Sequence, residues 1–230
     1  MDSAGYLAHL RRELDAFAAC LSGDLSARVE YCGDWTLYDL ADHLGRQNLW
    51  AAAAVTEQHG DLDPPPAPRE PAALATWFRG TCGTELAALD TDPSAPAWTI
   101  APPPTVGFWQ RRRCLETLVH RWDAEHALGI PSRLDPELAG DGVAEVIDTM
   151  APRQVRLGRT AAPAHAVGLT AADTGSAWTL GPGDPVASVR GTAAGLLLLL
   201  WGRCAADDPA LAWSGDREAG RAVLAGALVP

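Results

Sequence analysis

The chain changes its sequence pattern near residue 150, and this change limits its fold more than any other feature. Before that point, apolar residues recur at spacings of three and four, which is typical of amphipathic helices. After it, short β-prone segments alternate with clusters of turn-forming residues. We therefore predict an α+β protein with two domains, a helical bundle over residues 1–155 and a smaller α+β domain over residues 156–230.

Helix start and stop signals divide the first part further. The second helix has the clearest start, because Thr36 can cap it and Asp39, three residues on, can complete a capping box. The predicted helices of the first part cover residues 3–21, 36–59, 72–89, 108–128 and 135–150, with an extended segment at 98–100. The second part contains predicted strands at 164–173, 176–180 and 185–191, and predicted helices at 192–203 and 217–228.

Charge and composition exclude several partners. The net charge of −11 would repel nucleic acid and anionic membranes. We interpret the basic triplet 111–113 as a solvated helix face, since it is too short to reverse that charge. The longest apolar run, 193–201, is far shorter than the roughly 20 residues of a membrane span. Single scattered cysteines and an N-terminus without a secretory apolar segment predict a soluble, cytoplasmic protein.

The predicted helix 108–128 carries ionisable residues beside its apolar face. Glu116 and His120 are four residues apart, so their Cβ atoms should lie roughly 6 Å from each other. His43, on the second helix, is the third candidate ligand, and Asp39 and Asp42 are placed to orient its imidazole. A His, His, Glu set leaves a coordination position open, as in catalytic zinc sites. The alternative is that both histidines are ordinary helix residues and Glu116 is a surface charge.

Several other residues have expected roles. Asp123 either orients a ligand of the site or is a polar residue at the edge of the core. Cys114 points away from Glu116 and is expected to be buried and inert. His126 falls on the apolar stripe, so packing is its expected role. Among the tryptophans, Trp50 and Trp109 are candidates to line a pocket.

Three segments occur in the order and at the separations of a known family: DWTLYDLADHL, RRRCLETLVHRWDAEHALGIP and GTAAGLLLLLWGR. The chain thus resembles the mycothiol-dependent maleylpyruvate isomerase family of the DinB/YfiT-like superfamily. This resemblance implies a DinB-like four-helix bundle that binds zinc, or another divalent metal, through His43, Glu116 and His120. It also implies a smaller C-terminal, sterol-carrier-like α+β domain. One departure is Asp34, which stands where a glycine commonly precedes the tryptophan.

The resemblance further implies that Arg203, in the WGR segment, meets an acidic substrate or the thiol cofactor. From the sequence alone, Arg203 could equally be a cation favoured by the dipole at the end of a helix. The expected function is a zinc-dependent enzyme in which a metal-bound mycothiol thiolate adds to a small electrophilic or unsaturated acid. The outcome is cis/trans isomerisation or thiol transfer.

Two alternatives to this function stay open. One is a metal-dependent hydrolase without a thiol cofactor, and the other is a non-catalytic, metal-stabilised binding module. Thiol dependence separates the first alternative from the expected enzyme, and a complete set of four protein ligands would favour the second. The sequence identifies neither the physiological substrate nor the thiol-binding residues, and it leaves the oligomeric state open, a monomer included.

Overall fold

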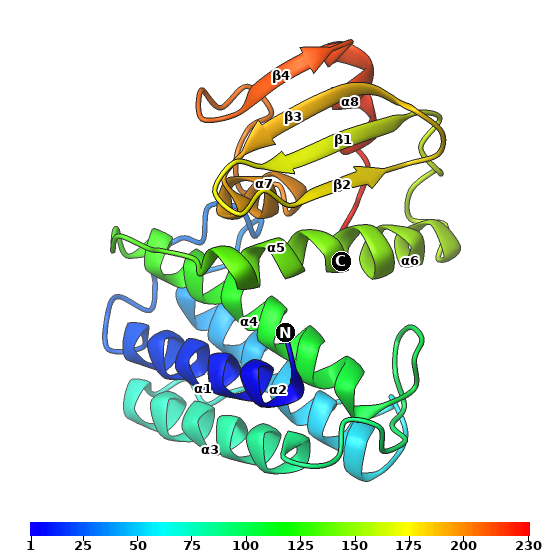
Figure 1. The fold of residues 1–230 in the computed structure, drawn as a ribbon. Coiled ribbons are helices and arrows are strands. Elements are labelled where there is room, and N and C mark those ends of the chain that lie inside the picture. Colours follow the sequence, from blue (N-terminus) through cyan, green and yellow to red (C-terminus); the bar gives the residue numbers. More distant parts are fainter. The chain divides into compact units, whose positions relative to one another are not determined.

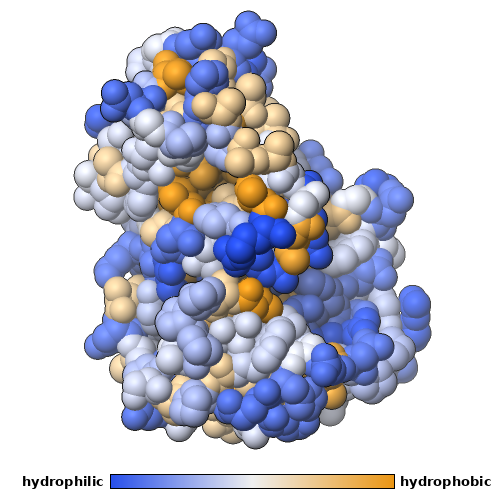
Figure 2. Space-filling model, turned by 90° about the vertical axis from the view of Figure 1, so that its right-hand side faces the viewer, coloured by the Kyte–Doolittle hydropathy of each residue, from blue (hydrophilic) through white to orange (hydrophobic).

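The computed structural model describes residues 1–230, which form two compact units, Met1–Arg133 and Leu134–Pro230. Helices make up the first unit, and the second combines helices with one four-stranded sheet (Figure 1). The predicted α+β fold class is confirmed. No helix is both long enough and apolar enough to cross a membrane. Figure 2 shows one face of the molecule, on which hydrophilic residues predominate and hydrophobic residues form small groups.

Four helices build the first unit, close to their predicted bounds. Helix α4 packs against α1 and α2, and α2 also packs against α3. The capping box that starts α2 is present, because the Thr36 side chain accepts from the Asp39 N–H and the Asp39 carboxylate accepts from the Thr36 N–H at 2.8 Å. The four helices are α1 (Ser3–Cys20), α2 (Leu37–Thr56), α3 (Pro71–Leu89) and α4 (Val106–Ala127).

Helix α4 is the central helix of this unit. It contacts α1, α2 and α3, and every residue from 112 to 121 is buried. Arg112 and Arg113 are therefore 3% and 0% exposed, so the interpretation of the basic triplet as a solvated face is wrong for both. Along this stretch the helix has no solvent face, so its polar groups must find partners inside the protein. Cys114 is fully buried, as predicted.

The segment predicted to be extended, 98–100, forms no strand. A single bridge joins Pro96 to Thr105, and the Trp98 N–H donates to the Ala54 carbonyl at 3.1 Å. The Trp98 ring also packs at 5.5 Å from that of Trp50. Aromatic packing and this contact with α2, rather than strand pairing, hold the segment.

The second unit begins with α5, which continues through a π-helical turn into α6. Its sheet has the strand order β2, β1, β3, β4, in which β1 and β3 are parallel and the outer pairs antiparallel. Helices α7 and α8 both contact β1 and β3. The elements are α5 (Pro136–Glu145), the π-turn (Val146–Met150), α6 (Ala151–Arg156), β1 (Ala166–Ala171), β2 (Ala177–Leu180), β3 (Pro185–Gly191), α7 (Ala193–Leu200), β4 (Ala212–Gly215) and α8 (Arg217–Leu224).

Alternation along the central strands explains how the sheet is covered. Val167 and Leu169 of β1 are buried, as are Ala187 and Val189 of β3, whereas the residues between them are partly exposed. One face of these strands therefore carries the core. Strand β4 was not predicted, because four largely exposed residues are too short to establish a period of two.

The structure places the division between units before α5, whereas the sequence pattern placed it at residue 155. Helix α5 packs against α7, which lies in the second unit. The helical period continues through α5 and α6, so the sequence pattern contains no signal at the point where the packing partner changes.

Candidate metal centre

Three side chains from two helices of the first unit converge at one point. Nε2 of His43, on α2, lies 3.9 Å from Oε1 of Glu116, on α4. Nε2 of His120, one turn further along α4, lies 4.0 Å from the same oxygen. The ligand atoms of the three residues are all within 4.8 Å of one another. The structure thus brings together the three residues that the sequence analysis selected as ligands.

These donor atoms fit a divalent transition metal. Two imidazole nitrogens and one carboxylate oxygen form a set that zinc uses in catalytic sites, and three protein ligands leave room for a further one. Nδ1 of His120 is bonded to Oδ2 of Asp123 at 3.0 Å, which leaves Nε2 directed at the shared point. Such a bond from the second imidazole nitrogen to a carboxylate is a regular feature of metal-binding histidines.

A second group of potential ligands shares His120. Sγ of Cys32 lies 3.7 Å from Oδ2 of Asp123, and with His120 these residues also fall within 4.8 Å of one another. However, this group would use Nδ1 of His120, which already bonds to Asp123. The first group keeps that bond intact, so we consider it the better candidate.

The charges of the ligands suit metal binding. Burial acts to raise the pKa of Glu116, but the guanidinium groups of Arg112 and Arg113 outweigh it and hold this pKa well below its ordinary value. Burial lowers the pKa of His120, although the Asp123 carboxylate opposes the shift. A carboxylate anion and a neutral imidazole are the protonation states that a metal requires.

His43 is oriented differently from the prediction. Its ring packs at 4.9 Å from the Trp35 ring, and 28% of its side chain is exposed. Asp39 is engaged in the capping box, and Asp42 accepts a hydrogen bond from the Ala67 N–H at 2.6 Å. The prediction that these two acids orient His43 is therefore wrong: Asp39 bonds to Thr36, and Asp42 to Ala67 and Arg46, rather than to the imidazole.

A cavity of about 260 Å³ opens beside His43. Trp50 lines it, as predicted, whereas Trp109 lies beneath Trp50 at 5.1 Å between ring centres and is almost completely buried. A ligand can therefore approach the cluster from solvent at His43. The other lining residues are Arg46, Gln47, Leu62, Asp63 and Pro64.

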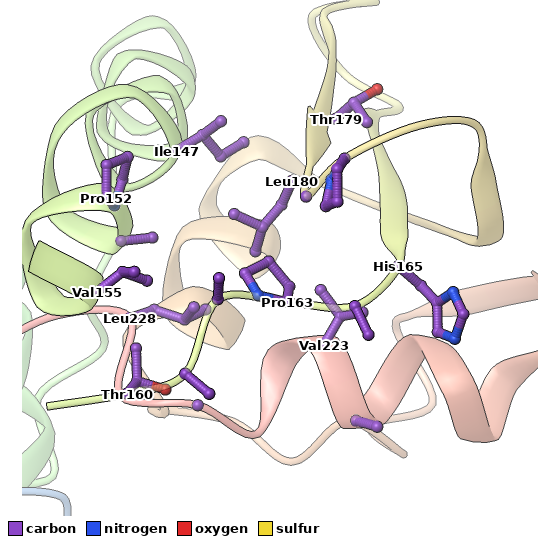
Figure 3. A pocket seen from close by; sticks show the side chains of 18 of the residues that line it. Ile147, Pro152, Val155, Thr160, Pro163, His165, Thr179, Leu180, Val223 and Leu228 are labelled. Carbon is purple, nitrogen blue, oxygen red and sulfur yellow. The ribbon is translucent and has the colours of Figure 1, made fainter. Parts of the chain in front are cut away.

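A larger cavity, of about 650 Å³, lies in the second unit, and its chemistry is different. Figure 3 shows its apolar lining, with Pro152 and Val155 facing Leu180 and Pro163. His165 is its one ionisable lining residue. Size alone would select this cavity, but it contains no group of metal ligands and none of the predicted site residues.

Arg203 lies in the turn that ends α7. Its N–H donates to the Leu198 carbonyl at 2.7 Å, and the preceding Gly202, at φ +69°, donates to the Leu199 carbonyl. This is the Schellman pattern of helix termination, in which glycine takes the left-handed position. Nη1 of Arg203 donates to the Trp201 carbonyl at 2.7 Å, with the guanidinium 5.5 Å from the Trp201 ring centre. Arg203 thus lies at the C-terminal end of a helix, as in the interpretation of this residue as a cation favoured by the helix dipole. Its contacts with Trp201 orient the guanidinium group.

Glu116 is supported by three buried residues that were not predicted from the sequence. Arg113 donates to Oε2 of Glu116, to Oε1 of Glu85 at 2.6 Å and to Oδ1 of Asn48 at 2.7 Å. The last two partners are 28 and 65 residues away in the sequence, so no local pattern marks them. A usable signal was the spacing of three between Arg113 and Glu116, which places them on the same side of a helix.

His126 is also close to α4's ionisable residues but belongs to a different contact. Its ring stacks on Trp122 at 4.7 Å, and Nε2 lies 2.8 Å from Oε2 of Glu30. It takes no part in the ligand cluster. The packing expected for this residue is present, although its side chain is 41% exposed.

Replacing Asp123 by asparagine is expected to weaken metal binding roughly 10- to 100-fold, because the carboxylate no longer fixes the His120 ring. Competition with a chromogenic chelator measures this affinity. Glu125→Gln is the control, since Glu125 lies two residues further along α4 and pairs with Arg121 at 2.6 Å. Equal affinities of Asp123→Asn and wild type would show that Asp123 is only a polar residue at the edge of the core.

Comparison with known domain families identifies both parts of the chain. The mycothiol maleylpyruvate isomerase N-terminal domain matches residues 7–125, and the MDMPI C-terminal domain matches residues 137–222. Two uncharacterized proteins of Mycobacterium tuberculosis, MT0763 of strain CDC 1551 and Rv0738 of strain H37Rv, are similar in sequence. Each is 28% identical over 158 residues, which cover 64% of this chain and 80% of the relative.

Two solved structures have a similar fold. The crystal structure of the mycothiol-dependent maleylpyruvate isomerase superposes with a TM-score of 0.71, at 15% identity and 93% coverage of both chains. A histidine-to-alanine mutant of that enzyme gives a TM-score of 0.68 at the same identity and coverage. The first domain match alone spans more than half of the 230 residues. The chain therefore belongs to the mycothiol-dependent maleylpyruvate isomerase family.

Proposed function

We propose that this protein is a metal- and mycothiol-dependent enzyme that acts on a small unsaturated acid, as a cis/trans isomerase or an S-transferase. The observation that carries the proposal is the convergence of His43, Glu116 and His120 beside a cavity open to solvent. Membership of a family named for a mycothiol-using isomerase supports the thiol. Maleylpyruvate is the first substrate to test, because the structural relative is named for it.

The residues of the site have separate tasks in this proposal. His43, Glu116 and His120 hold the ion, and their donor atoms favour zinc. A bound divalent ion supplies Lewis acidity, which favours the thiolate form of a coordinating thiol near neutral pH. Asp123 holds the His120 ring through Nδ1 and so keeps Nε2 available. The cavity beside His43 admits the thiol or the acid from solvent.

His43, Glu116 and His120 would hold the ion, and a thiol bound to it would supply a nucleophile for the double bond of an unsaturated acid. Reversible addition to that double bond would allow cis/trans isomerisation. Addition completed by the proton that the thiol itself gave up would be thiol transfer, so neither outcome would need a further co-reactant.

The test is turnover of maleylpyruvate and related unsaturated acids, with and without mycothiol, before and after removal of metal. We expect turnover to require both the thiol and the ion, and to return when the ion is restored. Equal turnover without mycothiol would contradict the thiol chemistry and favour a hydrolase. A protein that is fully active after its metal is removed would contradict the metal site.

We also propose that Arg203 binds the carboxylate of the substrate through paired hydrogen bonds. Arg203→Ala is expected to lower kcat/KM for acid substrates roughly 10- to 100-fold, the effect of losing a charged hydrogen bond, while metal content stays at the wild-type level. Arg217→Ala is the matched control. The Arg217 guanidinium lies 6.0 Å from the Trp213 ring centre and donates to the Ala206 carbonyl, so it makes similar local contacts. If the two variants have equal kcat/KM values for acid substrates, Arg203 serves only to end α7.

A further inference from the structure

Arg113 is a fully buried cation with partners on three helices. Its side chain is 0% exposed. Nε donates to Glu85 on α3, Nη2 donates to Asn48 on α2, and Nη1 donates to Glu116 on α4 itself. Because the guanidinium group is planar and each of its nitrogens is engaged, these bonds determine both its position and its orientation.

The two carboxylate oxygens of Glu116 face different groups. Oε2 accepts the hydrogen bond from Arg113. Oε1 lies near Nε2 of both histidines, at 3.9 Å and 4.0 Å, and also 3.2 Å from Nη2 of Arg112. A cation that is shared with both imidazole nitrogens would therefore meet Oε1, whereas Oε2 is bonded to a buried guanidinium.

Glu85 contributes to this arrangement only through Arg113. Its side chain is fully buried, its Oε1 lies 2.6 Å from Nε of Arg113, and its Oε2 has no hydrogen-bond partner. A buried carboxylate oxygen without a partner is unfavourable and uncommon in native structures. Glu85 therefore serves to hold one guanidinium group, at some cost to its own hydrogen bonding.

We propose that Arg113 is a positioning residue for the metal site: held by Glu85 and Asn48, it fixes Glu116 so that this ligand binds the ion through Oε1 alone. The inference rests on the proposed function, in which Glu116 and the two histidines hold a divalent ion. It extends the site beyond the ligands, to residues on α2 and α3. It also predicts the manner of binding, one carboxylate oxygen rather than two.

Arg121 provides a matched control on the same helix. Its side chain is 6% exposed, and Nε donates to Oε2 of Glu13 at 2.7 Å. It also donates to Glu125 and to Ser132. None of these partners is a proposed ligand, so Arg121→Met removes a comparable buried ion pair without changing the contacts of Glu116.

The experiment is a titration of metal-free protein with Co²⁺, followed by the visible absorption of the bound cobalt. Arg113→Met is expected to bind Co²⁺ roughly 10- to 100-fold more weakly than wild type. The absorption per bound ion should also fall, because a released Glu116 can use both oxygens and raise the coordination number. Arg113→Lys, which keeps the charge but can reach fewer partners, should lie between the two. Arg121→Met should match wild type in affinity and spectrum, even if it unfolds at a lower temperature.

The outcomes separate this inference from the proposed function. Suppose that Arg113→Met binds Co²⁺ with wild-type affinity and spectrum, whereas His120→Ala loses Co²⁺. This result would overturn the positioning role of Arg113 and leave the metal site in place. A wild-type protein that binds no Co²⁺ would overturn both. If Arg113→Met does not fold, Glu85→Gln decides, because it keeps the side-chain shape and removes the charge that holds Arg113. We expect it to weaken Co²⁺ binding several-fold, and unchanged binding would overturn the inference.

Discussion

Replacing His120 by alanine is expected to remove nearly all the metal that the wild-type protein retains, about one divalent ion per chain. The variant leaves two ligands from two different helices, Glu116 and His43, and two ligands hold an ion poorly. The loss of affinity should exceed the roughly 10- to 100-fold that removal of an orienting partner costs. Elemental analysis of protein purified without added metal measures the content, and mycothiol-dependent turnover should fall with it.

His43→Ala tests the same site with less risk to the fold. The His43 side chain is 28% exposed, whereas that of His120 is 7% exposed, so its removal should disturb packing less. Glu116 is a poorer choice for substitution, because its loss would also leave the buried Arg113 without one of its partners. Metal loss in both histidine variants, with near-wild-type thermal unfolding for His43→Ala, is the expected pattern.

His126→Ala is the control for these variants. It removes a histidine from the same helix, but one that stacks on Trp122 and pairs with Glu30 outside the cluster. It should keep wild-type metal content. If His126→Ala loses as much metal as His120→Ala, or if His43→Ala stays as metal-rich as wild type, the proposed ligand set is incorrect.

The convergence of the three proposed ligands could be predicted from local rules. A spacing of four places Glu116 and His120 on one side of α4, and His43 shares a side of α2 with the buried Leu40 and Leu44. The support of Glu116 could not be predicted in this way. Arg113 meets Glu85 and Asn48 only through the packing of three helices, and the sequence does not show which of their sides face one another.

The fold shows the same division between local and long-range information. The predicted helices with clear caps or breakers, α1 to α4, are present close to their predicted bounds. Strand β4 pairs with β3 only after α7 has intervened in the sequence, and its four residues carry no pattern of their own. The division between units was placed too late because a helical period does not reveal the packing partner of a helix.

Substitutions at the contact between α5 and α7 test whether α5 belongs to the second unit. Leu197 of α7 is 1% exposed, and an ideal Cβ at Gly142 of α5 would lie 2.9 Å from its Cδ1 atom. Leu197→Ala is expected to lower the free energy of unfolding of the second unit by about 2–5 kcal/mol, through lost burial and a new cavity. For a unit of this size, each kcal/mol lowers the Tm by about 4–8 °C, so thermal unfolding resolves the change readily.

Gly142→Ala should then have opposite effects in two backgrounds. In an unhindered helix, alanine stabilises by up to about 1 kcal/mol relative to glycine. Gly80→Ala on α3 is the control, because a Cβ at Gly80 would meet no atom within 4 Å. In the wild-type protein, the Gly142 Cβ is too close to Leu197, so Gly142→Ala should destabilise. In the Leu197→Ala background that space is free, and the same change should stabilise. A double-mutant cycle measures this reversal of sign. If Gly142→Ala stabilises both backgrounds equally, Gly142 and Leu197 are not in close contact in solution, and the placement of α5 against α7 is contradicted at this point.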